Sequence, residues 1–151
     1  MVALFSGGNI GENLIVEDSF GFNLRHFNSI VAKKRIVFRN DLHVELLTDD
    51  IEAFYFDFEN DSFFPSQAKN LHIPIKSPGR CYGIIQWIRL QMDKKIIYEN
   101  HPSDKSHVSG WQQVAYVFPE PVDVKPGQIA VVSASHDRAA PWFYLAGIES
   151  A

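Results

Sequence analysis

The chain has one cysteine, no long apolar run and little excess of charge, and each of these features excludes a class of protein. Cys81 alone cannot form an internal disulfide, which favours a reducing compartment, and we interpret it as a small packing residue. No apolar run approaches the ~20 residues that span a bilayer, and the first residues lack the pattern of a signal peptide. The net charge of −4 gives no surplus of cations for phosphate contacts. We therefore expect a cytoplasmic protein that binds neither membrane nor nucleic acid.

Metal-binding and nucleotide-binding patterns are also missing. The six histidines show no H-x-H or H-E-x-x-H spacing, so we expect no metal, and a barrel enzyme that uses His101, His107 and His136 is the weakest option. The stretch S-G-G-N-I-G at residues 6–11 follows only five residues and precedes a segment more strand-like than helical. It is therefore interpreted as a turn and not as a phosphate-binding loop.

The composition favours β-structure. The chain has 151 residues, of which 46% are hydrophobic and 21% charged, as in a single globular domain. Aromatic residues make up 13%, with 12 Phe, and such residues favour pleated, half-buried surfaces. No repeat or linker divides the sequence, so residues 1–151 are taken as one domain.

Alternating apolar and polar residues predict several strands. Phe54, Phe56 and Phe58 should point to one side, with Tyr55 and Asp57 opposite. Turns are expected at residues 77–79 (S-P-G) and 125–127 (K-P-G), where Pro presets φ and Gly accepts a positive φ. The expected strands cover residues 53–58, 83–92, 114–118, 128–136 and 142–148. This pattern predicts a mainly β fold, an antiparallel β-barrel or sandwich.

One stretch departs from the strand pattern. Leu24, Phe27, Ile30 and Val31 approximate helical spacing, and Asn23 is a suitable N-cap. The sequence therefore predicts a short helical insertion near residues 23–42.

The tryptophans are the most informative aromatic residues. Trp87 and Trp142 lie within strand patterns and are interpreted as core or barrel-wall residues. Trp111 opens a strand behind Ser109 and Gly110, and the polar residues after it, including Gln113, indicate a solvent-exposed strand start. The residues alone leave two interpretations of Trp111: it packs under a loop, or it forms the rim of a ligand site.

The order of several motifs resembles the C-terminal β-barrel of protein arginine N-methyltransferases. The resemblance includes the divergent members that carry tetratricopeptide repeats, and it covers nearly the whole chain. The matching stretches are G-I-I-Q-W-I-R-L (83–90), W-Q-Q-V-A-Y (111–116) and V-K-P-G (124–127), with G-F-N-L-R-H-F-N (21–28), L-L-T-D-D-I-E-A-F-Y-F-D-F (46–58) and V-V-S-A-S-H-D (131–137).

The resemblance implies a division of labour between domains. Such enzymes bind S-adenosylmethionine in a separate Rossmann-like domain, whose paired glutamates hold the substrate guanidinium. Neither a Gly-rich cofactor loop nor a double-glutamate hairpin is present here, so no catalytic residue and no cofactor are assigned to this chain. In the family, the barrel contributes one wall of the substrate cleft through a Thr-His-Trp loop. Residues 109–111 occupy that position, with Gly110 in place of the histidine.

Two functions of different class follow from these observations. The first is a substrate-binding and dimerisation β-barrel of an arginine-methyltransferase-like protein. It would act on peptide or protein substrates with a catalytic domain in cis or in trans, and the arm candidate at residues 23–42 leaves a homodimer open. Its expected substrate-binding residues are Ser109, Gly110, Trp111 and Gln113. The alternative is a free-standing β-barrel module that binds a peptide or a carbohydrate, with Trp111 and Trp142 as stacking platforms.

Overall fold

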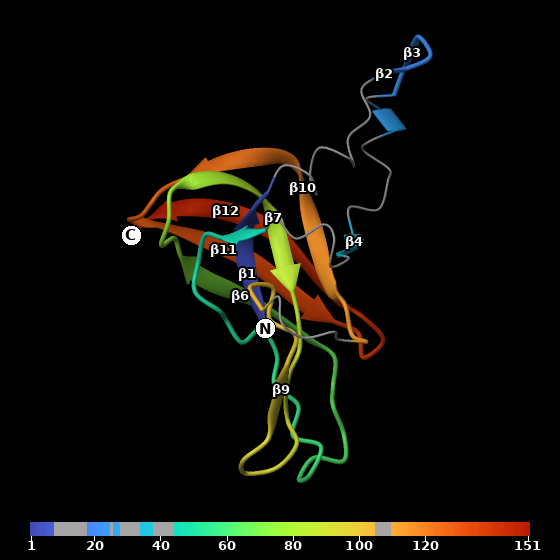
Figure 1. Ribbon diagram of the computed structural model, residues 1–151, viewed down its shortest axis with the longest axis vertical. Coiled ribbons are helices and arrows are strands. Elements are labelled where there is room, and N and C mark those ends of the chain that lie inside the picture. Colours follow the sequence, from blue (N-terminus) through green and yellow to red (C-terminus); the bar gives the residue numbers. More distant parts are fainter. Residues whose placement is uncertain (8–17, 25, 28–33, 38–43, 105–109) are drawn as a thin grey trace.

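The computed structural model is built almost entirely from antiparallel strands (Figure 1). It describes residues 1–7, 18–24, 26–27, 34–37, 44–104 and 110–151. The mainly β fold expected from the aromatic, alternating sequence is therefore confirmed. In the described ranges the two principal sheets are separate layers of a sandwich and do not close into a barrel.

The larger sheet has five strands in the order β4-β10-β7-β1-β5. β10 and β7 form the longest pairing in it, and β1 lies on the other side of β7. The strands are β1 (Val2–Ser6), β4 (Lys34–Val37), β5 (Glu45–Leu46), β7 (Gly79–Gln86) and β10 (Gln113–Val124).

The smaller sheet has three strands in the order β12-β11-β6. It consists of β6 (Gln67–Pro74), β11 (Gln128–His136) and β12 (Pro141–Ser150). Two short ribbons complete the described strands: β2 (Asp18–Ser19) with β3 (Phe22–Asn23), and β8 (Arg89–Gln91) with β9 (Ile97–Glu99). The β2–β3 ribbon lies apart from the sandwich, whereas the β8–β9 ribbon extends from one end of it (Figure 1).

The core lies between the two sheets. Ile84 of β7 and Phe118 of β10 pack there against Ile73 of β6 and Val132 of β11. A second buried cluster on the larger sheet includes Ile85 next in sequence to Ile84. β7 is thus buried on both faces, as is typical of a central strand.

Proline and glycine account for an irregularity in β10 and for the turn that follows it. The β10–β7 register shifts between Val117 and Val122, because Pro119 and Pro121 have no N–H to donate to the ladder. Gly127, in the K-P-G turn between β10 and β11, has a φ of 84°, the left-handed value expected of its glycine.

Two of the expected strands differ from those observed. Residues 83–92 do not form one strand, because β7 ends at Gln86. The Trp87 indole N–H then donates to Glu99 of β9, and the Ile88 N–H donates to the side chain of Asn100, the next residue. Residues 53–58 form no strand, although the expected common orientation holds for Phe54 and Phe56, whose rings both contact His136. The strands expected at 114–118, 128–136 and 142–148 are confirmed within β10, β11 and β12.

The expected helical insertion near residues 23–42 is wrong at residues 34–37, the part of its second half that the structure describes. Lys34–Val37 form β4, which pairs with β10 through Val114–Tyr116 and neighbours. The β-branched pair Ile36 and Val37 favours this pairing over a helix. His26 and Phe27 are helical, and residues 25, 28–33 and 38–42 lie outside the described residues.

Candidate functional site: an aromatic cleft at one end of the sandwich

A cleft of about 700 Å³ lies beside the start of the β8–β9 ribbon, whose residues Arg89 and Leu90 line it. Its walls come from five parts of the chain that are distant in sequence: Met1, the segment 53–64, the β7–β8 link at 86–90, Trp111, and the β11–β12 turn from His136 to Phe143. A volume of this size is typical of ligand sites.

Phenylalanine rings dominate one wall of the cleft. Phe56 stacks on Phe58 with ring centroids 6.2 Å apart, and Phe64 meets both rings edge to face at 5.6 and 5.1 Å. Phe58 remains largely exposed. Asp57 holds the turn that follows, because it accepts hydrogen bonds from the backbone N–H groups of Glu59 and Asn60. These bonds lower the pKa of Asp57, the Asn60 side chain contributing most.

His136 lies beneath this wall at the end of β11. Its ring meets Phe54 edge to face at 4.6 Å and Phe56 at 5.2 Å, and only 6% of the residue is exposed. Within the described part of the chain, its Nε2 atom has no hydrogen-bond partner. The next residue, Asp137, accepts backbone hydrogen bonds from Ala139 and Ala140, both at 2.9 Å, and these bonds lower its pKa.

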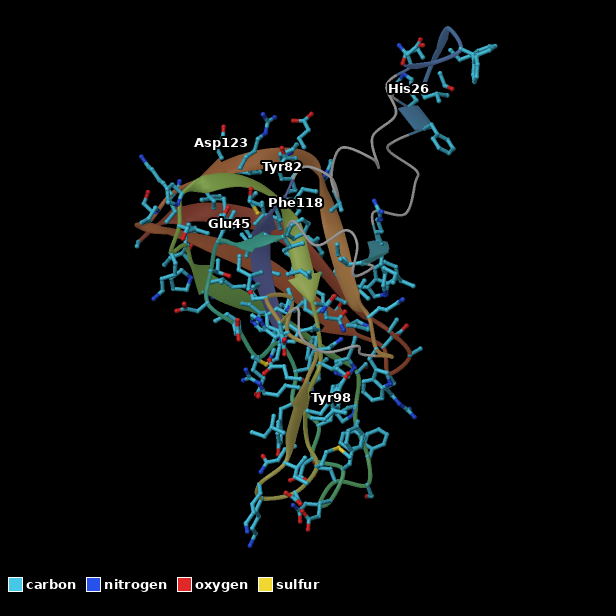
Figure 2. The ribbon with its side chains drawn as sticks, viewed as in Figure 1. His26, Glu45, Tyr82, Tyr98, Phe118 and Asp123 are labelled. Atoms are coloured by element: carbon cyan, nitrogen blue, oxygen red, sulfur yellow. The ribbon has the colours of Figure 1, made fainter. Side chains whose placement is uncertain are left out.

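Trp111 stands on the rim of the cleft. Its side chain is 54% exposed and meets Tyr98 of β9 edge to face at 6.0 Å. Figure 2 places Tyr98 on the ribbon below the sandwich, away from Phe118 in the core. The carbonyl oxygen of Trp111 accepts a 2.8 Å hydrogen bond from the buried Asn100 side chain. The side chain is therefore exposed beside the cleft, and its contact with a ligand stays a prediction.

Of the other expected site residues, the two that the structure describes, Gly110 and Gln113, do not line the cleft. Gln113 donates from Nε2 to the carbonyl oxygen of Asn100 at 2.8 Å, so its amide supports the same corner. Gly110 has open space around its Cα position, and Ser109 lies outside the described residues. Trp87 is buried as expected, whereas Trp142 is 51% exposed on β12 with Lys34 Nζ 5.0 Å from its ring centroid.

A charged network borders the cleft at the β8–β9 ribbon. Glu99 accepts hydrogen bonds from Trp87 Nε1 at 2.7 Å and from Arg89 Nε at 2.9 Å. Burial favours a raised pKa for Glu99, but the bonds from Arg89 and Trp87 outweigh it, and the pKa is lowered. The guanidinium of Arg89 also lies 3.6 Å from Asp50, so two carboxylates neutralise this cation.

His101 extends that network. Nδ1 of its ring accepts a hydrogen bond from the Ser103 N–H, so the ring proton lies on Nε2 and is donated to Asp50 at 3.1 Å. The ring also meets Trp87 edge to face at 5.0 Å. His101 and His136 therefore have different surroundings, and His107 lies outside the described residues. No group of three or more metal-ligating side chains occurs in the described ranges.

The single cysteine, Cys81, does not line the cleft. Cys81 is fully buried in the core, and burial raises its pKa to about 11. The interpretation of Cys81 as a packing residue is confirmed.

Sequence reasoning identified Trp111 but missed the rest of the cleft. The F-Y-F-D-F alternation was visible, yet it indicated a core strand. His136 was expected at the end of a strand and Arg138 in the stretch D-R-A-A-P after it, and nothing in the sequence brings these residues to the phenylalanines.

A search with the sequence finds no matching protein-family model and no matching curated protein. None of the described segments forms an apolar helix of bilayer-spanning length.

Proposed function

We propose that this sandwich is a substrate-binding domain of the arginine methyltransferase type, and that its cleft receives a peptide or protein segment. One observation carries the proposal: Trp111, which occupies the family's tryptophan position in the resemblance, is half-exposed on the rim of the aromatic cleft. An exposed aromatic ring that is fixed through its backbone offers contact area at little conformational cost.

The corner around Trp111 supports a recognition role. Asn100 is 5% exposed and binds the Trp111 carbonyl oxygen, while Gln113 binds the carbonyl oxygen of Asn100. The indole therefore projects from a backbone whose carbonyl oxygen is held by Asn100, which Gln113 in turn holds. Such pre-organisation is what a binding rim requires.

The methyl transfer itself belongs, in this proposal, to a separate domain in cis or in trans. Nucleoside cofactors of this kind are held by a strand, a Gly-rich turn and a following helix. The described residues that form the sandwich pair antiparallel throughout. We accordingly assign substrate binding, and no catalytic step, to this chain.

The experiment compares two tryptophans of nearly equal exposure. Binding of labelled arginine-containing peptides to the full chain is measured by fluorescence anisotropy. Trp111→Ala should weaken binding about tenfold, because an interfacial aromatic anchor typically contributes that much or more. Trp142→Ala is the control, since Trp142 is equally exposed but does not line the cleft. Equal loss in both variants, or in neither, would contradict the proposal.

A calorimetric titration tests the division of labour. S-adenosylmethionine added to the chain should give no saturable heat. Tight, stoichiometric binding of the cofactor would show that the chain carries its own donor site and would overturn the assignment.

A free-standing module for peptide or carbohydrate is the second candidate, and the half-exposed side chains of both Trp111 and Trp142 favour it. The two platforms are not part of one cleft, and Lys34 lies over the Trp142 ring. Retention on a glycan array that both Trp111→Ala and Trp142→Ala abolish would support this candidate over the first.

A further inference from the structure

The cleft has a charge pattern that restricts what it can hold. The side chains that line it include Arg89, Arg138 and His136 but, among the described residues, no carboxylate. A guanidinium buried in a protein site needs carboxylate partners. The cleft therefore offers a substrate guanidinium no carboxylate partner, and its own cations repel one.

Two cationic side chains beside the cleft, Arg138 and Lys69, contact aromatic rings and form no ion pair with a described carboxylate. Arg138 lies over the Phe63 ring, with its guanidinium carbon 5.6 Å from the centroid, and Lys69 Nζ is 5.3 Å from the centroid of Phe54. Arg89 differs, because Glu99 and Asp50 neutralise it. Across the described ranges, no carboxylate lies within ion-pair distance of Arg138 or Lys69.

The backbone fixes Arg138 at the cleft mouth. Asp137 accepts hydrogen bonds from the N–H groups of Ala139 and Ala140, which closes a tight turn. Arg138 sits in that turn with a φ of 79°, a value uncommon for a residue with a side chain. Strained positions of this kind persist where the surrounding structure holds them, and they cluster at ligand sites.

The walls between these cations are apolar. Phe54, Phe56, Phe58 and Phe64 present faces and edges to the cleft, and Trp111 closes the far rim. Aromatic walls favour aromatic and large aliphatic side chains. Positive groups beside them favour carboxylates and repel Lys and Arg.

We propose that the cleft binds an acidic, aromatic segment that flanks the target arginine of a protein substrate, with an aromatic side chain between Phe56 and Trp111 and a carboxylate beside Arg138. This inference rests on the proposed function, and it adds the substrate class. The target arginine itself then lies outside the cleft, toward the domain that supplies the methyl group. Substrates selected in this way differ from uniformly basic, glycine-rich tails.

The test uses three labelled peptides of equal length, each with one arginine, and the full chain. The first carries Phe flanked by Asp and Glu, the second has the same sequence with Asn and Gln, and the third is a Gly- and Arg-rich peptide. The first should bind about tenfold more tightly than the second and more tightly still than the third. Its affinity should fall as salt rises, because exposed charge pairs are screened.

Variants assign the charge preference to one residue. Arg138→Gln should reduce the preference for the acidic peptide over its amide counterpart about three- to tenfold, whereas Arg138→Lys should keep most of it. The matched control is Arg80→Gln, which removes one exposed arginine from β7 outside the cleft. Loss of preference in both Gln variants would indicate net charge alone and would overturn the site.

The outcomes separate this inference from the proposed function. If Trp111→Ala weakens peptide binding while acidic and amide peptides bind equally, the binding domain stands and the acidic preference fails. Tighter binding of the Gly- and Arg-rich peptide also overturns the inference. If a dimer forms instead and the peptides cannot compete with it, the cleft is occupied by a second copy, and the substrate assignment is wrong.

Discussion

The side-chain nitrogen of Asn100 lies 2.8 Å from the carbonyl oxygen of Trp111, and its side-chain oxygen accepts the Ile88 N–H at 2.9 Å. One buried amide thus joins the β7–β8 link to Trp111, just before β10. Both of these segments contribute to the cleft. Asn100 therefore sets the position of Trp111 without lining the cleft itself.

Replacement of Asn100 should loosen this corner. Asn100→Ala leaves a part-buried N–H of Ile88 and a part-buried carbonyl of Trp111 without their partner, so the free energy of unfolding should fall by about 1–2 kcal/mol in urea titration. Asn100→Asp keeps the acceptor for Ile88 but loses the donor to Trp111. It should also be destabilised at neutral pH, because a buried carboxylate oxygen then faces the Trp111 carbonyl oxygen, and it should bind substrate peptide more weakly. Wild-type stability and binding in Asn100→Ala would contradict the role of this clamp.

The sequence predicts the sandwich better than it predicts the cleft, for a physical reason. Period-two alternation records which residues face the core, and the strands at residues 114–118, 128–136 and 142–148 follow from it. The segment 53–58 has the same alternation, but it forms a wall of the cleft, and its rings contact His136. Alternation does not distinguish a core from an aromatic cleft, because both select the same side chains.

A single sequence also does not show which distant segments contact each other. Residues 83–92 continue the apolar alternation across Trp87, but the hydrogen bonds to Glu99 and Asn100 divide the segment into two strands. Similarly, nothing local to Arg138 indicates Phe63 as its neighbour. Trp111 was singled out because small and polar residues around it predict an exposed strand start, and because the resemblance aligns it with the tryptophan of the family's Thr-His-Trp loop.

Gly83 is a position where only glycine fits. A Cβ atom there would overlap the carbonyl oxygen of Tyr116 in β10 and crowd the Phe5 ring. Gly83→Ala should therefore destabilise the sandwich by more than about 3 kcal/mol, because backbone must move in its centre. The matched control is Gly147→Ala in β12, where nothing lies within 4 Å of the added atom. Thermal unfolding of the two variants gives the comparison, and similar melting temperatures would refute the close approach.

Stability should depend on the charge of Glu99 under acid conditions. Burial favours a raised pKa, but hydrogen bonds from Arg89 and Trp87 lower it below the ordinary value of 4.5. A carboxyl whose pKa is lower in the folded state stabilises the protein above its unfolded-state pKa and loses that contribution as pH falls through the folded value. The unfolding free energy should therefore decrease below about pH 4.5.

Two variants test whether the ion pair of Glu99 and Arg89 causes that pH dependence. Glu99→Gln should flatten the profile below pH 4.5, and Arg89→Gln should do so in part, since Trp87 still donates to Glu99. Urea titrations at a series of pH values measure the slope. An unchanged slope in Glu99→Gln would show that other carboxyl groups carry the acid sensitivity.

His136 should limit the stability of the sandwich. Its Nε2 atom is buried, lacks a hydrogen-bond partner in the described structure, and is surrounded by the rings of Phe54 and Phe56. An unsatisfied buried polar atom costs about 1–3 kcal/mol, and an apolar ring of similar shape avoids that cost. His136→Phe should therefore be at least as stable as the wild type in urea titration. His136→Ala should lose about 2–3 kcal/mol, because it leaves a cavity beneath the cleft wall. If the Phe variant were as unstable as the Ala variant, Nε2 would have a partner, and the polar atom would stabilise the cleft wall through it.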